Sequence, residues 1–151
     1  MIKCCSLAKA PKIAVEFNNV NVDNSDYFTT STFTNVVRSQ DRNFFIIHEN
    51  IRSFGSFFDK FHSFASELNR AADVIVLSET WFSANTCHDV QGYTGFHTYR
   101  ADKTGGSVSV FIRNCYTSTR MAKFSVYHAY YVISVVKVSL LNNCTVIIIG
   151  I

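Results

Sequence analysis

The chain has 151 residues, of which 48% are hydrophobic and 17% are charged, and it contains 14 Phe and 7 Tyr. This composition is that of one ordinary folded domain, and it excludes a chain that is disordered over most of its length. The formal net charge of +3 is weakly basic, so it permits a nucleic-acid partner without arguing for one.

Residues 1–42 differ from the rest of the chain. They are rich in Asn, Ser and Thr without clear periodicity, and they contain the single proline, Pro11. We expect a poorly ordered leader here, with a short strand near residues 13–17. The five cysteines form no Cys-x-x-Cys pair, which favours free thiols over a disulfide framework. No signal peptide or transmembrane segment is recognised, so we expect a nuclear or cytoplasmic protein without a membrane partner.

A strand–helix–strand pattern begins at residue 44. The apolar run 44–47 suits a strand that is buried on both faces, and the polar residues after it are interpreted as a loop. Apolar residues at helical spacing predict a helix over residues 57–70, and Ser56 with Asp59 resembles a capping box at its start. The run 73–78 is a second strand. This order predicts a βαβ unit with two parallel strands and a right-handed connection.

The rest of the chain is a succession of predicted strands. They cover residues 107–113, 130–140 and 144–151, and the sequence Leu-Asn-Asn between the last two predicts a hairpin turn. The final run stops inside an apolar strand without a polar tail. We therefore expect the chain to be one piece of a larger domain.

Asn50 and Glu79 each follow one of the two predicted parallel strands, which end at the same edge of a sheet, where α/β folds commonly bind ligands. A carboxylate there can bind Mg²⁺. The alternative, which spacing alone favours, is a glutamate that caps the next turn or pairs with a lysine. Asn50 could hydrogen-bond at the same site, although asparagine is common in loops.

Weaker candidates surround these two residues. Arg52 either binds phosphate or is simply solvated, and His48 lies within reach of Asn50. Gly105-Gly106 either brings the backbone close to a ligand or forms a hairpin turn. Trp81 and Phe82 could stack on a base, but packing in the core is the preferred interpretation.

Several segments occur in an order that resembles a known family. They are "IIHENIRSF", "DVIVLSETWF", "GYTGFHTYRADKTGGSVSVFIRN" and "VIIIGI". Over residues 43–151 the chain resembles the N-terminal half of the endonuclease/exonuclease/phosphatase domain of non-LTR (LINE-like) retrotransposon proteins. The resemblance implies an α/β (α+β) fold, which would be part of a DNase I-like two-sheet β-sandwich flanked by helices.

The resemblance also implies a function. Members of the family hydrolyse phosphate esters with Mg²⁺. The retrotransposon branch nicks DNA, and the freed 3′ hydroxyl primes reverse transcription by the reverse transcriptase domain of the same protein. Glu79 would then be the metal-binding carboxylate and Asn50 the amide that orients the site. Arg52 and Arg100 would be candidates for contacts with DNA.

The chain departs from the family pattern at several points. Ser107 stands where a third glycine is usual, and the Tyr-Arg-Pro-Pro, later Asp-x-Asn and Asp-His motifs have no counterpart. The hydrolytic set is therefore incomplete, and we expect no activity from this chain alone. Two alternatives are a piece of another phosphoesterase of the superfamily and a non-catalytic module that binds nucleic acid or protein.

Overall fold

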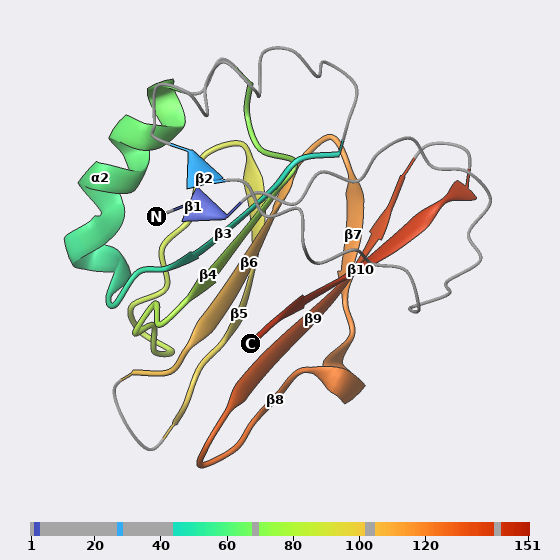
Figure 1. The fold of residues 1–151 in the computed structure, drawn as a ribbon. Helices are drawn as coiled ribbons and strands as arrows, with labels where there is room; N and C mark the ends of the chain where they lie inside the picture. Colours follow the sequence, from blue (N-terminus) through green and yellow to red (C-terminus); the bar gives the residue numbers. More distant parts are fainter. Residues whose placement is uncertain (1, 4–26, 29–43, 68–69, 102–104, 141–142) are drawn as a thin grey trace.

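The computed structural model describes residues 2–3, 27–28, 44–67, 70–101, 105–140 and 143–151. It shows two β-sheets that face each other, with one helix on the outer side of the first sheet (Figure 1). The described part of the chain is therefore a mixed α and β fold. This confirms the predicted α+β class.

The first sheet has six strands in the order β2-β1-β3-β4-β6-β5. They are β1 (Ile2–Lys3), β2 (Tyr27–Phe28), β3 (Ile46–Asn50), β4 (Val74–Ser78), β5 (Tyr93–Thr98) and β6 (Val108–Arg113). The pair β3 and β4 is parallel, as predicted, and the other pairs of this sheet are antiparallel. The expected leader supplies β1 and β2, whereas its predicted strand at residues 13–17 lies outside the described residues.

The strand β3 extends past its predicted end at residue 47. Its residues pair one by one with β4, from Ile46 opposite Val74 to Asn50 opposite Ser78. The polar residues that were interpreted as a loop therefore belong to the strand. The apolar run alone did not show this, because pairing with a buried neighbour extends a strand beyond its apolar residues.

The helix α2 (Phe54–Glu67) begins three residues before its predicted start. Its first residue is held from outside the helix, because the Phe54 amide donates to the carbonyl of Thr80 at 2.9 Å. Ser56 lies inside the first turn, where its hydroxyl donates to the carbonyl of Ser53 at 3.2 Å. The predicted capping box at Ser56 is therefore wrong.

Two apolar cores lie on the two sides of the first sheet. Along β4, Ile75 and Leu77 pack toward the core on the helix side, whereas Val74 and Val76 pack toward the second sheet. This alternation follows from the two-residue period of a strand. Because all five residues of β4 are buried, the strand is the centre of the fold.

The second sheet contains four strands in which β9 pairs with β10, β7 and β8. The elements are β7 (Thr117–Arg120), the 3₁₀ turn η2 (Ala122–Phe124), β8 (Val126–Tyr127), β9 (Val132–Ser139) and β10 (Thr145–Gly150). Strands β9 and β10 pair antiparallel, as the predicted hairpin requires, although residues 141–142 of its turn lie outside the described residues. Among the described residues, no helix is long and apolar enough to cross a membrane.

A buried carboxylate ties the two sheets together at the end of β4 that is remote from Glu79. Asp73 is 1% exposed, and it accepts hydrogen bonds from the Phe45 amide at 2.8 Å, from Arg70 at 2.9 Å and from the Tyr116 hydroxyl at 2.9 Å. A buried carboxylate with this many donors is a structural group. Asp73 is therefore satisfied without a ligand.

Candidate functional site

The candidate site lies where β3 and β4 end and β6 begins. Asn50 is opposite Ser78 in the parallel register, and Ser78 is opposite Val108 in the antiparallel pair that follows. Glu79 comes directly after Ser78. The structure therefore brings Asn50 and Glu79 to one edge of the first sheet.

Glu79 is half-buried and its carboxylate is held in place at one oxygen. Oε2 accepts hydrogen bonds from the Gly106 amide at 3.0 Å and from Nε1 of Trp81 at 3.1 Å. Oε1 accepts none from the described residues, and none of their ion pairs involves Glu79. The lysine-pair alternative thus has no support here, and one carboxylate oxygen is left for a ligand.

Three loops meet at this edge with an unusual backbone. The residues with positive φ are Arg52 (43°), Ser53 (92°), Glu79 (58°), Trp81 (59°), Gly105 (101°) and Gly106 (68°). For a residue other than glycine this conformation costs roughly 1–3 kcal/mol. Strain of this kind persists only where the surroundings hold it, and it is frequent at functional sites.

Backbone hydrogen bonds between the loops hold this conformation. The Ser53 amide donates to the carbonyl of Glu79 at 2.7 Å, and the Thr80 amide donates to the carbonyl of Ser107 at 3.1 Å. The Ile51 amide adds a third bond, to the carbonyl of Ser78 at 3.0 Å. These bonds continue the sheet beyond its last strand pairs, so the position of the Glu79 carboxylate is set by the backbone on both sides.

Arg100 packs against the glycine turn beside Glu79. A Cβ atom placed on Gly106 would lie 2.9 Å from Cζ of Arg100, so only glycine allows this approach. The Nε atom of Arg100 is buried and has no hydrogen-bond partner among the described residues. A buried unsatisfied donor is costly and calls for an explanation such as a ligand, and an arginine donor fits an anion.

The other predicted site residues lie on the surface of the same edge. Asn50 and Arg52 are exposed, and the Asn50 amide makes no hydrogen bond with the described residues. His48 shares a strand face with Asn50, and its Nε2 atom lies 3.5 Å from Oγ of Ser78. The edge therefore carries an exposed amide and an exposed guanidinium, beside an imidazole that lies at hydrogen-bonding distance from Ser78.

The two aromatic residues after Glu79 have different roles. Phe82 is 5% exposed and belongs to the helix-side core, which confirms the core interpretation for this residue. Trp81 is 43% exposed and donates to Glu79, so the same interpretation is wrong for it. The sequence did not indicate this hydrogen bond, because the reversed backbone at Glu79 and Trp81 breaks the alternation of the strand.

The donors at this edge fit a hard divalent cation. Mg²⁺ takes oxygen ligands and is usually held by one or two carboxylates, with water in its other positions. Oε1 of Glu79 is a carboxylate oxygen of this kind, and the Asn50 amide carries a neutral oxygen at the same edge. No group of three or more His, Cys, Asp or Glu that could hold a metal ion occurs in the described part of the chain.

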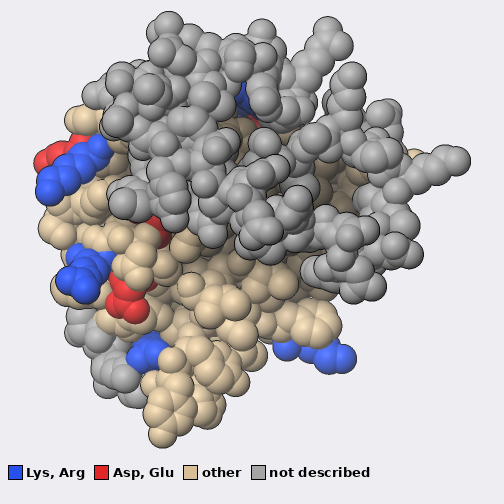
Figure 2. Space-filling model, in the orientation of Figure 1, with Lys and Arg blue, Asp and Glu red and all other residues tan. Residues whose placement is uncertain are grey.

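On the face of the molecule that Figure 2 shows, positive charge does not gather in one patch. On the face that Figure 2 shows, lysine and arginine side chains lie interspersed with aspartate and glutamate, and most of the described surface is uncharged. This distribution agrees with the net charge of +3. This face therefore offers no broad basic surface among the described residues.

Comparisons of the chain with models of known protein families, with curated proteins and with solved structures find no match.

Proposed function

We propose that this edge of the first sheet is the metal- and phosphate-binding part of a Mg²⁺-dependent DNA endonuclease site. The observation that carries the proposal is the Glu79 carboxylate, which is held at Oε2 and whose Oε1 accepts no hydrogen bond from the described residues. The buried Nε of Arg100, which also has no partner among those residues, lies next to it across Gly106. A phosphate that is bound to a metal ion requires a ligand for the cation and, close to it, a hydrogen-bond donor for the phosphate oxygens. The motifs around Asn50 and Glu79 support the non-LTR retrotransposon branch of the endonuclease/exonuclease/phosphatase class.

Each residue has a defined part in this proposal. Oε1 of Glu79 holds the metal ion, which when bound polarises a phosphoryl oxygen and stabilises the leaving oxygen. Arg100 donates from Nε to a phosphate oxygen, and the Asn50 amide orients the same group. Arg52, exposed on the neighbouring loop, contacts the DNA backbone. Apart from β1 and β2, the two facing sheets would then be the N-terminal half of a DNase I-like sandwich over residues 43–151.

Cleavage needs more than these groups. Hydrolysis also requires a positioned water and a general base, and the family supplies them from motifs that this sequence does not contain. We therefore propose that the chain binds metal and DNA at the Glu79 edge and does not nick DNA by itself. In the parent protein the 3′ hydroxyl at the nick would prime DNA synthesis by the reverse transcriptase domain.

Metal binding tests the first step. Mn²⁺, a paramagnetic substitute for Mg²⁺, should bind the chain weakly, and Glu79→Gln should weaken binding by about tenfold or more, because the free oxygen is its carboxylate ligand. Electron paramagnetic resonance of free Mn²⁺ measures this. Glu49→Gln is the matched control, because Glu49 lies on the alternate face of β3 from Asn50. Equal Mn²⁺ affinities of Glu79→Gln and Glu49→Gln would contradict the proposed metal site.

Nicking tests the second step. Conversion of supercoiled plasmid to open circle should be absent for this chain in Mg²⁺. It should appear when the C-terminal half of a retrotransposon endonuclease domain is joined to residue 151, and Glu79→Ala should abolish it. Mg²⁺-dependent nicking by the chain alone, lost in Glu79→Ala, would show that the additional motifs are dispensable.

A further inference from the structure

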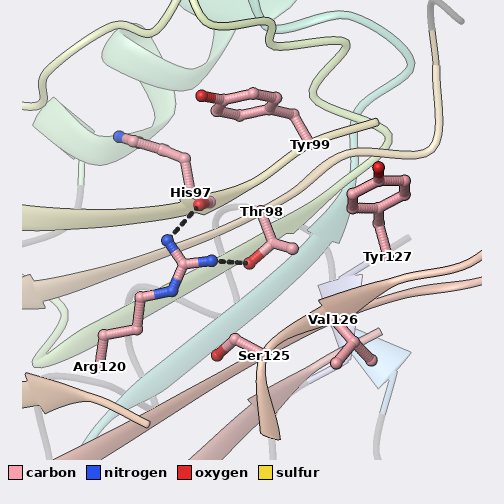
Figure 3. Close-up of a pocket in the computed structure, with 7 residues that line it drawn as sticks. All are labelled: His97, Thr98, Tyr99, Arg120, Ser125, Val126 and Tyr127. Atoms are coloured by element: carbon pink, nitrogen blue, oxygen red, sulfur yellow. Dashed lines mark hydrogen bonds between the residues drawn. The ribbon is translucent and has the colours of Figure 1, made fainter. Parts of the chain in front are cut away.

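A second polar cleft opens at the end of β5, on the side of the first sheet that faces β7 and β8. It has a volume of about 420 Å³ and is lined by His97, Thr98, Tyr99, Arg120, Ser125, Val126 and Tyr127. Figure 3 shows Arg120 reaching from β7 to the end of β5, with the rings of Tyr99 and Tyr127 beyond Thr98. None of these residues belongs to the Glu79 edge.

The guanidinium of Arg120 is positioned by the strand that it reaches. Nη1 donates to the carbonyl of His97 at 3.0 Å, and Nη2 donates to Oγ1 of Thr98 at 3.1 Å. An arginine side chain has five N–H donors, and three of those of Arg120 make no hydrogen bond with the described residues. Since two bonds already hold the group, little further entropy is lost when an anion binds it.

The rest of the lining suits an anion that carries a ring. Among the described lining residues there is no carboxylate, and burial lowers the pKa of His97, whose Nδ1 lies 2.9 Å from Oγ of Ser109. The ring of His97 packs against Phe82 and Phe111 of the helix-side core, so Arg120 supplies the cleft's positive charge. Tyr99 and Tyr127 add two aromatic rings, on which a sugar or a base packs.

The cleft and the Glu79 edge lie in one row across the first sheet. Ser78 is opposite Val108, and Val108 is opposite Thr98. Two strand spacings of about 4.8 Å therefore separate Ser78 from Thr98, which is about 10 Å. Tyr99, in the cleft, also directly precedes Arg100, which packs on Gly106 beside Glu79.

We propose that this cleft binds one nucleotide of the DNA strand that crosses the Glu79 edge, with its phosphate on Arg120 and its sugar or base against Tyr127 and Tyr99. At a rise of 3.4 Å per nucleotide, a separation of about 10 Å corresponds to about three nucleotides. The cleft thus sets the register of the strand relative to the metal. The inference rests on the proposed function for its ligand, but the binding itself needs no metal.

Aromatic variants test the ring contact without disturbing the core. The probes are a fluorescein-labelled 12-nucleotide DNA strand and its duplex, titrated in EDTA with fluorescence anisotropy as the readout. Tyr127→Ala should raise the Kd by about fivefold or more, as stacking contacts do, while Tyr127→Phe keeps the ring and the affinity. Tyr130→Ala is the matched control, because Tyr130 lies in the same hairpin, is 87% exposed and does not line the cleft.

Charge variants test the phosphate contact. Arg120→Gln should weaken binding and lower the slope of log Kd against log salt by about one, the value for one phosphate contact. Lys123→Gln removes an equal charge from η2, outside the cleft, and should leave the slope unchanged. A thermal unfolding curve of Arg120→Gln shows whether this variant still folds. If it does not, Tyr127→Ala tests nucleotide binding in the cleft independently.

The outcomes separate this inference from the proposed function. Nucleotide binding in the cleft would be contradicted if Tyr127→Ala and Tyr130→Ala changed the Kd equally, or if the unmodified chain bound neither probe. The tests of Glu79 would be unaffected. If only Tyr127→Ala raised the Kd and Glu79→Gln left Mn²⁺ binding unchanged, nucleotide binding in the cleft would be supported and metal binding by Glu79 would be contradicted. Preference for the single strand would assign the rings to a base, and preference for the duplex would assign them to the sugar.

Discussion

The two sheets bury their strands to different extents. In the first sheet, β4 is buried along its whole length, because α2 covers one face and the second sheet covers the other. In the second sheet, β10 buries Ile148 on its inner face but leaves Ile147 and Ile149 45% and 57% exposed on the outer face. Among the described residues, its free edge has no strand partner.

This difference explains where the polar side chains of the candidate site lie. A strand that is buried on both faces can present a polar group only beyond its end, which is where Glu79 lies. The position of such a group is then as rigid as the core that precedes it. The outer face of β10 is instead an apolar surface that a partner or another copy of the chain can cover. We therefore expect the isolated chain to self-associate.

The largest effect should distinguish the two sheets directly. Ile75→Ala in β4 removes a side chain that is 2% exposed, and it should lower the free energy of unfolding by about 2–5 kcal/mol. Ile149→Ala makes the same chemical change in β10 at an exposed position, and it should cost about 0.5 kcal/mol or less. Urea unfolding measures both. Similar losses would mean that the outer face of β10 is covered in solution.

A smaller effect should appear at the glycine turn of the site. Gly106→Ala places a Cβ atom at a φ of 68° and 2.9 Å from Cζ of Arg100, so we expect a loss of about 1–2 kcal/mol in the free energy of unfolding. Gly55→Ala in α2 is the control, because a Cβ atom there meets nothing within 4 Å and alanine favours the helix. An unchanged free energy of unfolding in Gly106→Ala would show that the turn relaxes and that the turn does not fix the position of the Arg100 side chain.

The smallest effect concerns the pH dependence at the Asp73 end of β4. Burial, together with the hydrogen bond to Asp73, raises the pKa of Tyr116 from 10 to about 12. Because the folded chain holds this proton more tightly than the unfolded chain, the contribution to stability is complete below about pH 10 and is lost as the pH rises to 12. Tyr116→Phe should therefore cost about 1 kcal/mol at pH 8 and flatten the decline above pH 10.

Tyr130→Phe is the control for that measurement, because Tyr130 is 87% exposed. Its unfolding profile above pH 10 should follow that of the unmodified chain. An unchanged profile in Tyr116→Phe would show that the hydrogen bond between Tyr116 and Asp73 does not contribute to stability.

The elements that the sequence predicted well are those whose burial is uniform. The run 73–78 predicted β4 to within one residue, because a short run of β-branched residues has one stable arrangement in a sheet with both faces covered. The order strand, helix, strand predicted the parallel pair of β3 and β4 for the same reason. The end of β3 and the start of α2 were predicted less well, since pairing with β4 decides the first and the hydrogen bond that the Phe54 amide donates to the Thr80 carbonyl decides the second.

The sequence by itself determined the α+β class, the parallel pair of strands and the position of Glu79 directly after the second of them, because these follow from apolar periodicity and from local chain direction. Asn50 was expected after the first strand and is instead its last residue. Only the tertiary structure decided which atoms surround Glu79. The hydrogen bond from Gly106 to Glu79 and the cleft at Arg120 join residues more than 20 positions apart, and the hydrogen bond from Trp81 requires a left-handed backbone. Such contacts leave no periodic signal in the sequence, because they depend on the meeting of loops from different strands.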